Sequence, residues 1–119
     1  MNIPKEAQEK IIELQTIEQN IQNFALQKQK FQIGLNEVDN ALSELKNLKD
    51  KEAYRIVGEI MIKSKKEDLE KDLNERKNIL ELRLNNIEKQ ENKINEKADY
   101  LKKEVMKIIE NEKGTKRTK

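Results

Sequence analysis

The side chains that could carry chemistry in this sequence are almost all carboxylates and amines. The 119 residues include 25 Lys and Arg and 23 Asp and Glu, but no Cys and no His. A thiol nucleophile, a Cys/His zinc site and His-based acid–base catalysis are therefore excluded. The sequence also has no Gly-rich phosphate-binding loop and no nucleophile–base pair. We expect no catalytic site, no metal site and no cofactor, which makes an enzyme the least favoured class.

The distribution of the charges favours a solvated surface. Lys and Glu are interleaved along most of the chain, whereas the last seven residues, KGTKRTK, are basic without an acidic residue. A nucleic-acid-binding surface needs basic residues gathered on one face. We therefore expect a flexible basic tail at 113–119. Salt-dependent binding of nucleic acid through this tail stays as a less favoured alternative.

The strongest chemical signal is an apolar island, AYRIVGEIMIKS, between two charged segments. Gly58 followed by Glu59 suits a two-residue type II′ turn, which would pair Val57 with Ile60. This predicts a β-hairpin over 53–63. Both faces of the ribbon are apolar and both edges are unpaired, so we expect it to pair with strands of other subunits. The predicted oligomerisation residues are Tyr54, Ile56, Val57, Ile60, Met61 and Ile62.

Two long helices must position this hairpin, and we predict them over 5–48 and 65–112. Pro4 suits the first helical turn, Ser64 with Glu67 reads as a capping box, and Gly114 is a plausible stop. Apolar residues recur at alternating intervals of three and four, as in a coiled-coil seam. The first seam is Leu14, Ile17, Ile21, Phe24, Phe31, Leu35, Val38, Leu42 and Leu45; the second is Leu73, Leu80, Leu84, Ile87, Ile94, Ala98, Leu101, Val105 and Ile108.

The two seams match each other in an antiparallel register. When facing residue numbers add to 115, Leu14 faces Leu101, Ile17 faces Ala98, and the other apolar layers also align. The misfits are Lys28 opposite Ile87, Val38 opposite Lys77 and Phe24 opposite Glu91. Long Lys and Glu side chains can lie along such a seam with their charges in water. The predicted fold class is therefore mainly α, a long antiparallel coiled coil with one hairpin where the chain turns back.

This plan resembles the β-type subunit of prefoldin, of the archaeal kind. The segments LQKQKFQIGLNEVDNAL, YRIVGEIMIK and LELRLNNIEKQENKINEK are similar to the first helix, the hairpin and the second helix of that family. The α-type subunit carries two hairpins, and the interval between the helices here has room for one. The resemblance implies a single prefoldin-like domain over 1–119.

The resemblance also implies a function. Two α-type and four β-type subunits would form a hexamer, in which the hairpins build an intersubunit β-barrel and the coiled coils project from it. Such hexamers hold non-native proteins without ATP and pass them to a group II chaperonin in the cytoplasm. A structural or adaptor coiled-coil protein that binds one dedicated partner is the competing interpretation.

Several apolar residues lie off the seam near the two chain ends, which the register places together at the free end of the coiled coil. They are Ile3, Ile11, Ile12, Met106 and Ile109. Exposed apolar side chains, with an adaptable Met among them, suit the binding of unfolded chains. The alternative is that these residues close the last helical turns. No apolar run reaches membrane-spanning length and no signal-peptide pattern opens the chain, so we expect a soluble intracellular protein.

Overall fold

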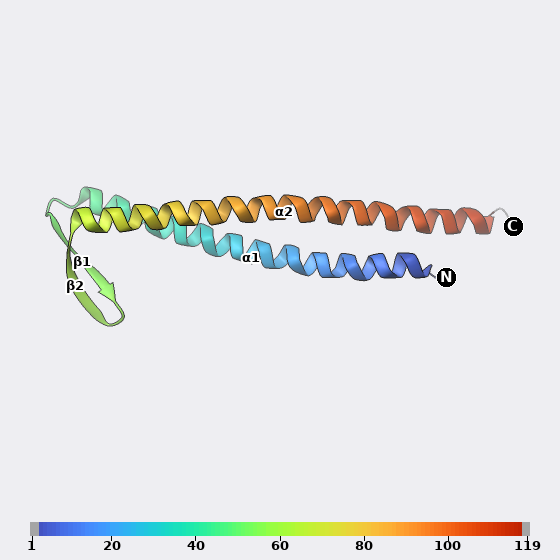
Figure 1. Ribbon diagram of the computed structural model, residues 1–119, viewed down its shortest axis with the longest axis horizontal. Coiled ribbons are helices and arrows are strands. Elements are labelled where there is room, and N and C mark those ends of the chain that lie inside the picture. The colour runs from blue at the N-terminus through green and yellow to red at the C-terminus, as the bar shows by residue number, and fades with distance from the viewer. Residues whose placement is uncertain (1–2, 118–119) are drawn as a thin grey trace. The chain divides into compact units, whose positions relative to one another are not determined.

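The structure, a computed structural model, describes residues 3–117, with side chains described as far as Lys113. Helix α1 spans Lys5–Asn47, strands β1 and β2 span Glu52–Val57 and Ile60–Lys65, and helix α2 spans Lys66–Arg117 (Figure 1). Two long helices with one antiparallel hairpin between them were predicted from the sequence, and this prediction is confirmed.

The hairpin has the turn that its sequence favours. Ile56 pairs with Met61 and Val57 with Ile60, which leaves Gly58 and Glu59 as the two-residue loop. Gly58 has a φ of 62°, and among the described residues no non-glycine residue has a positive φ. A type II′ turn needs a positive φ at its first central residue only, so Gly58 supplies the conformation that a side chain would disfavour.

The start of α2 differs from the sequence prediction. Ser64 is not a helix cap, because it lies within β2 and pairs with Ala53. The strand ladder continues to the pair Glu52 and Lys65, and α2 follows directly at Lys66. The capping-box interpretation was wrong because strand pairing engages the backbone that a capping residue would have left free.

The two helix ends also differ from the predicted bounds. Helix α1 ends at Asn47, and α2 continues past Glu112 and through Gly114 to Arg117. Glycine weakens a helix by about 1 kcal/mol relative to Ala but does not by itself stop it. The predicted basic tail at 113–119 is therefore helical as far as Arg117, and the remaining two residues lie outside the described part of the chain.

The structure forms two compact units, which we call the terminal unit (Met1–Gln27 with Ile87–Lys119) and the hairpin unit (Lys28–Asn86). In the terminal unit the core residues are Ile17, Ala98 and Leu101, with Leu14, Ile21 and Ile94 packed against them. Lys10 pairs with Glu104 at 3.6 Å, and Glu13 pairs with Lys97 at 3.4 Å. Because the partner's number falls as the α1 number rises, the helices are antiparallel here, as the seam register predicts.

The hairpin unit resolves one misfit of the predicted seam. Val38 is buried, and Lys77, expected to lie opposite it with its charge in water, instead forms a 2.8 Å ion pair with Asp39. Gly34 packs closely on Leu80, whose Cδ1 lies 3.5 Å from where a Cβ would stand on Gly34. These contacts again show that the helices are antiparallel. The polar side chain of Lys77 is accommodated in the seam because it has an ion-pair partner on the other helix.

The Asp39–Lys77 pair makes a testable contribution to stability. The Asp39 carboxylate, by its hydrogen bond and then by its charge, raises the pKa of Lys77 above the ordinary 10.5. A raised lysine pKa gives stability that is fully present below pH 10.5 and lost as the pH rises through the folded-state value. We therefore expect the melting temperature of the wild type to exceed that of Lys77→Gln at neutral pH, and this difference to shrink above pH 10.5. Thermal unfolding followed by circular dichroism measures it, and a difference that stays constant across that pH would contradict the prediction.

Candidate assembly and client-binding surfaces

The hairpin carries a large exposed apolar surface. All six predicted oligomerisation residues are exposed, with exposed fractions that range from 47% for Ile62 to 72% for Ile56. The set is Tyr54, Ile56, Val57, Ile60, Met61 and Ile62. A two-stranded ribbon with apolar residues on both faces is marginal in water and gains free energy when another chain covers it. The structure therefore brings these residues together as one candidate association surface.

Polar contacts attach the hairpin to the helices. Arg55 on β1 forms an ion pair with Asp72 on α2. At the base of the hairpin, Lys66 donates its backbone N–H to the Lys51 carbonyl at 2.8 Å and its ammonium to the Leu48 carbonyl at 2.9 Å. These contacts orient the ribbon without covering its apolar side chains.

A second ion pair lies on the hairpin itself and links its two strands. The Lys63 ammonium lies 2.7 Å from the Glu52 carboxylate. The hydrogen bond to this carboxylate, and then its charge, raises the pKa of Lys63. The pair therefore links the two strands near the open end of the ribbon.

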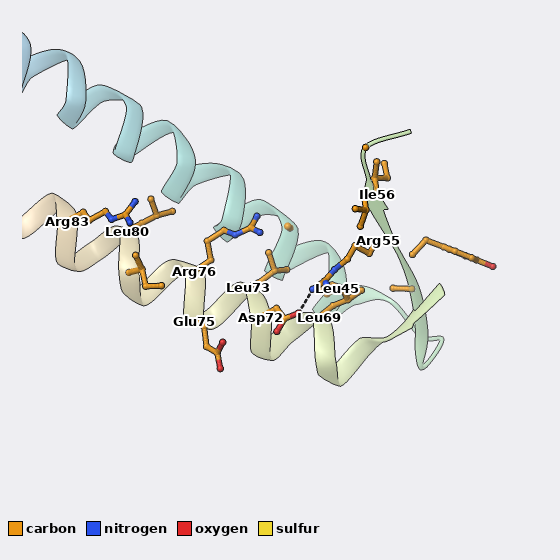
Figure 2. A pocket seen from close by; sticks show the side chains of 16 residues that line it. Leu45, Arg55, Ile56, Leu69, Asp72, Leu73, Glu75, Arg76, Leu80 and Arg83 are labelled. Carbon is orange, nitrogen blue, oxygen red and sulfur yellow. Dashed lines mark hydrogen bonds and ion pairs between the residues drawn. The ribbon is translucent and has the colours of Figure 1, made fainter. Parts of the chain in front are cut away.

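A groove runs between β1 and the helices of the hairpin unit (Figure 2). Its volume is about 1010 Å³. Residues 53–58 line one side consecutively, and α2 supplies most of the other side, including Asp72, Arg76, Ile79 and Arg83. Consecutive strand residues point to opposite faces of a ribbon. Since residues 53–58 all line the groove, the groove follows the edge of β1 rather than one of its faces.

The structure places all five predicted client-binding residues in the terminal unit. Ile12 and Met106 are exposed to 63% and 58%, and Ile3 is exposed to 43%. Ile11 and Ile109 are half-buried instead. The exposed fractions therefore divide the predicted set into three side chains that are open to a ligand and two that also support the packing of the helices.

The apolar candidates favour one flank of the coiled coil in this unit. Glu13 and Lys97 each precede a seam residue, and their ion pair marks the flank on which such positions meet. Ile11 and Ile109 each follow a seam position, so they lie on the opposite flank. Met106 lies one helical turn from Ile109, on the same side of α2. The Glu13–Lys97 pair and the residues Ile11 and Ile109 thus lie on opposite flanks of the terminal unit.

The sequence reasoning missed several exposed apolar residues on the outer helix faces. The side chains of these residues are at least half exposed. The residues are Leu26, Ile33, Ile79, Leu82 and Tyr100. The seam assignment could have identified them, because they occupy outward-facing heptad positions that a solvated helix normally fills with polar residues. It also did not predict that Arg55, Arg76 and Arg83 line one groove, since their proximity depends on how the hairpin folds back on α2.

The described residues contain neither a membrane span nor a metal-binding cluster. No helix in residues 3–117 is both long and apolar enough to cross a membrane. Over the same residues, no group of three or more acidic, His or Cys side chains is placed to hold a metal ion.

Comparison with known proteins gives a consistent result. The family model described as "Prefoldin subunit" matches residues 8–112. The prefoldin subunit beta of Pyrococcus horikoshii is 40% identical over 105 residues, which cover 87% of this chain and 90% of that protein. The corresponding protein of Archaeoglobus fulgidus is 29% identical over 113 residues, covering 94% and 97%.

A solved structure agrees with these sequence relatives. The crystal structure of the prefoldin beta subunit from Thermococcus strain KS-1 matches with a TM-score of 0.83 and 36% identity, over 89% of this chain and 94% of that one. Prefoldins are non-enzymatic chaperones whose subunits assemble into hexamers. The chain belongs to the prefoldin subunit family, and its function is that of a prefoldin chaperone subunit.

Proposed function

We propose that this chain is the β-type subunit of an archaeal-type prefoldin with two α-type and four β-type subunits. The observation that carries the proposal is the exposed apolar hairpin, which has no cover among the described residues of its own chain. Each β-type chain would contribute one hairpin to a shared β-barrel and one coiled coil to the client-binding side. The single hairpin between α1 and α2 favours the β type over a chain with two hairpins.

The terminal unit supplies the proposed client-binding surface. Unfolded proteins share no fixed sequence, so their binding depends on exposed apolar contacts rather than on specific hydrogen bonds. Ile3, Ile12 and Met106 provide such contacts directly, and Ile11 and Ile109 lie half-buried in the same unit. Several coiled coils acting on one client would raise the overall affinity without requiring a strong single site.

The holding step needs no nucleotide in this proposal, because apolar contact alone supplies the binding free energy. The hexamer would hold non-native proteins in the cytoplasm and pass them to a group II chaperonin. An adaptor coiled coil with one dedicated partner is not favoured, since the match to prefoldin subunits extends across both helices and the hairpin.

Native mass measurement with and without an α-type prefoldin subunit tests the proposal. With that subunit present, we expect a hexamer that contains four copies of this chain and two of the partner. We expect this complex to suppress the aggregation of an unrelated denatured protein in the absence of ATP. The same assay without the complex is the control. A complex of different stoichiometry would contradict the subunit type, and a complex that protects only one particular protein would favour the adaptor interpretation.

A further inference from the structure

The outward face of α1 in the terminal unit carries no charged residue between positions 12 and 26. With Leu14 and Ile17 in the seam, the heptad positions that point away from α2 hold only apolar residues, amides and one Thr. They are Ile12, Gln15, Thr16, Gln19, Gln22, Asn23 and Leu26, and all seven are exposed. The two charged residues of this stretch, Glu13 and Glu18, lie on the flanks beside the seam. We call the seven residues the amide face.

The outward face of α2 at the same level has a different composition. Leu14 and Ile17 pack with Ala98 and Leu101, which sets residues 89–103 of α2 beside the amide face. The outward positions in this stretch are Lys89, Asn92, Lys93, Glu96, Asp99, Tyr100 and Lys103, and they are also exposed. Five of these seven residues are charged, as is usual for a solvated helix. Contact with water alone therefore does not explain the composition of the amide face.

The amide groups of this face have no partner within the chain. Thr16 donates its hydroxyl to the Ile12 carbonyl at 3.3 Å. Over the part of the chain that the structure describes, the side chains of Gln15, Gln19 and Gln22 form no hydrogen bond, and neither does that of Asn23. A primary amide offers both N–H donors and a carbonyl acceptor. It can therefore pair with the N–H and C=O groups of another backbone, whatever the sequence of that backbone.

Charge and position favour a non-native polypeptide as the occupant of this face. A client of unrelated sequence that covered Lys or Glu side chains would leave them without a partner, which is costly. Amides avoid this cost, because a hydrogen bond to the client backbone replaces one to water. Ile12, an exposed residue of the proposed client-binding surface, lies at one end of the amide face. The face is thus a continuation of that surface along α1.

We propose that the amide face binds the backbone of a non-native polypeptide that lies extended along α1. Apolar contacts at Ile3, Ile12 and Met106 supply the binding free energy, and the amides keep the backbone of the bound segment hydrogen-bonded. The outward face of α2 stays in water. This inference rests on the client-holding function proposed above, and it adds the helix, the face and the chemistry of the contact.

Site-specific photocrosslinking tests which helix the client contacts, and the absence of natural cysteines makes the labelling specific. One preparation carries Gln19→Cys and the other carries Glu96→Cys, which is the matched control because both positions point outward at the same level. Each is labelled with benzophenone maleimide and assembled with an α-type subunit. Reduced lysozyme and reduced α-lactalbumin, a basic and an acidic non-native protein, serve as clients. Illumination should give a client adduct as the main product from Gln19→Cys and little from Glu96→Cys.

The crosslinking experiment has two results that would overturn the inference. Equal client yields from Gln19→Cys and Glu96→Cys would show that the client does not distinguish the two helices. A main product that joins Gln19→Cys to another subunit of the complex would assign the amide face to subunit packing. In both cases the proposed function would stand, because it requires only that the complex holds clients.

Added charge provides an independent readout. The double variant Gln15→Lys with Gln22→Lys places two charges on the amide face, and both lie at favourable helical spacing from Glu18. The half-suppressing concentration should rise for the basic client and fall for the acidic one. We expect the ratio of the two concentrations to change by at least about threefold.

The matched charge control is Glu96→Gln with Asp99→Asn, which changes the net charge by the same amount on the outward face of α2. This control should leave the ratio nearly unchanged. An equal change in both variants would show an effect of net charge rather than of contact, and no change in either would show that the client does not reach the amide face. Each of these results would overturn the inference, whereas a wild-type complex that holds neither client would contradict the proposed function itself.

Discussion

Replacing Ile60 and Ile62 with Lys is expected to release the subunits of the assembled protein while both helices stay folded. The two side chains lie on the same face of the ribbon and are exposed to 66% and 47% in the single chain. Each buried apolar side chain contributes about 1.5 to 3 kcal/mol at an interface. Losing two of them therefore lowers the association constant by roughly two to four orders of magnitude. Sedimentation velocity measures the release, and circular dichroism confirms that the helical content is unchanged.

The matched control for this variant is Ile33→Lys with Leu82→Lys. These residues belong to the same hairpin unit, are exposed to 51% and 62%, and lie on outer helix faces rather than on the ribbon. The control should assemble like the wild type. An oligomer that survives the hairpin changes, or that dissociates only in the control, would place the assembly surface on the helices.

Changing Ile3, Ile12 and Met106 together to Ser is expected to abolish most of the holding activity and to spare the oligomer. The three side chains are exposed, so their loss removes client contacts without opening the core at Ile17, Ala98 and Leu101. Because several coiled coils are proposed to act on one client, a small loss at each would be multiplied. We expect at least about a tenfold increase in the concentration of complex that half-suppresses aggregation of a denatured protein without ATP.

The control for the client-binding variant uses Leu26→Ser with Tyr100→Ser, which are exposed to 60% and 61% in the same terminal unit. This control should hold clients almost as well as the wild type. Equal loss in the control would show that client binding does not depend on the predicted residues in particular but on exposed apolar side chains throughout the terminal unit. Removing KGTKRTK alone should change little, since apolar contact is the proposed interaction, and a large loss on that truncation would show that binding is electrostatic.

Ile11 and Ile109 require separate treatment because they are half-buried. Substituting them changes the packing of the helices as well as the surface, so a loss of activity would have two explanations. Measuring the melting temperature beside the holding activity separates these effects. The division into exposed and half-buried candidates came from the structure, since the sequence pattern treats both as residues off the seam.

The apolar spacing predicted the parts of the fold that depend on burying one apolar stripe on each helix. Ile17 and Ala98 meet in the terminal core because a repeat of threes and fours leaves one stripe to bury on each helix. Gly58 predicted the turn because its positive φ is disfavoured for other residues. Features that depend on a local competition were less predictable. Ser64 can cap a helix or extend a strand, and pairing with Ala53 decided between them.

The groove could not be predicted from the sequence for a different reason. Arg55 and Asp72 belong to different elements, and their ion pair exists only because β1 folds back beside α2. No periodicity along the chain encodes that orientation. The exposed apolar residues of the hairpin were predictable by type, whereas the arginines that line the groove resembled any other charged residues of a solvated helix.

The Arg55–Asp72 ion pair has a consequence for the order of events in assembly. Both side chains are about half exposed, at 45% and 50%, so dissolved salt screens their attraction and the pair contributes little to folding. The ion pair instead orients the hairpin in the free subunit, before the hairpin meets a neighbouring subunit. If the hairpins mediate assembly as proposed, ionic strength should act on the encounter more than on the finished complex. Screening would widen the range of ribbon orientations before collision and slow association, while apolar burial would keep the assembled hairpins together.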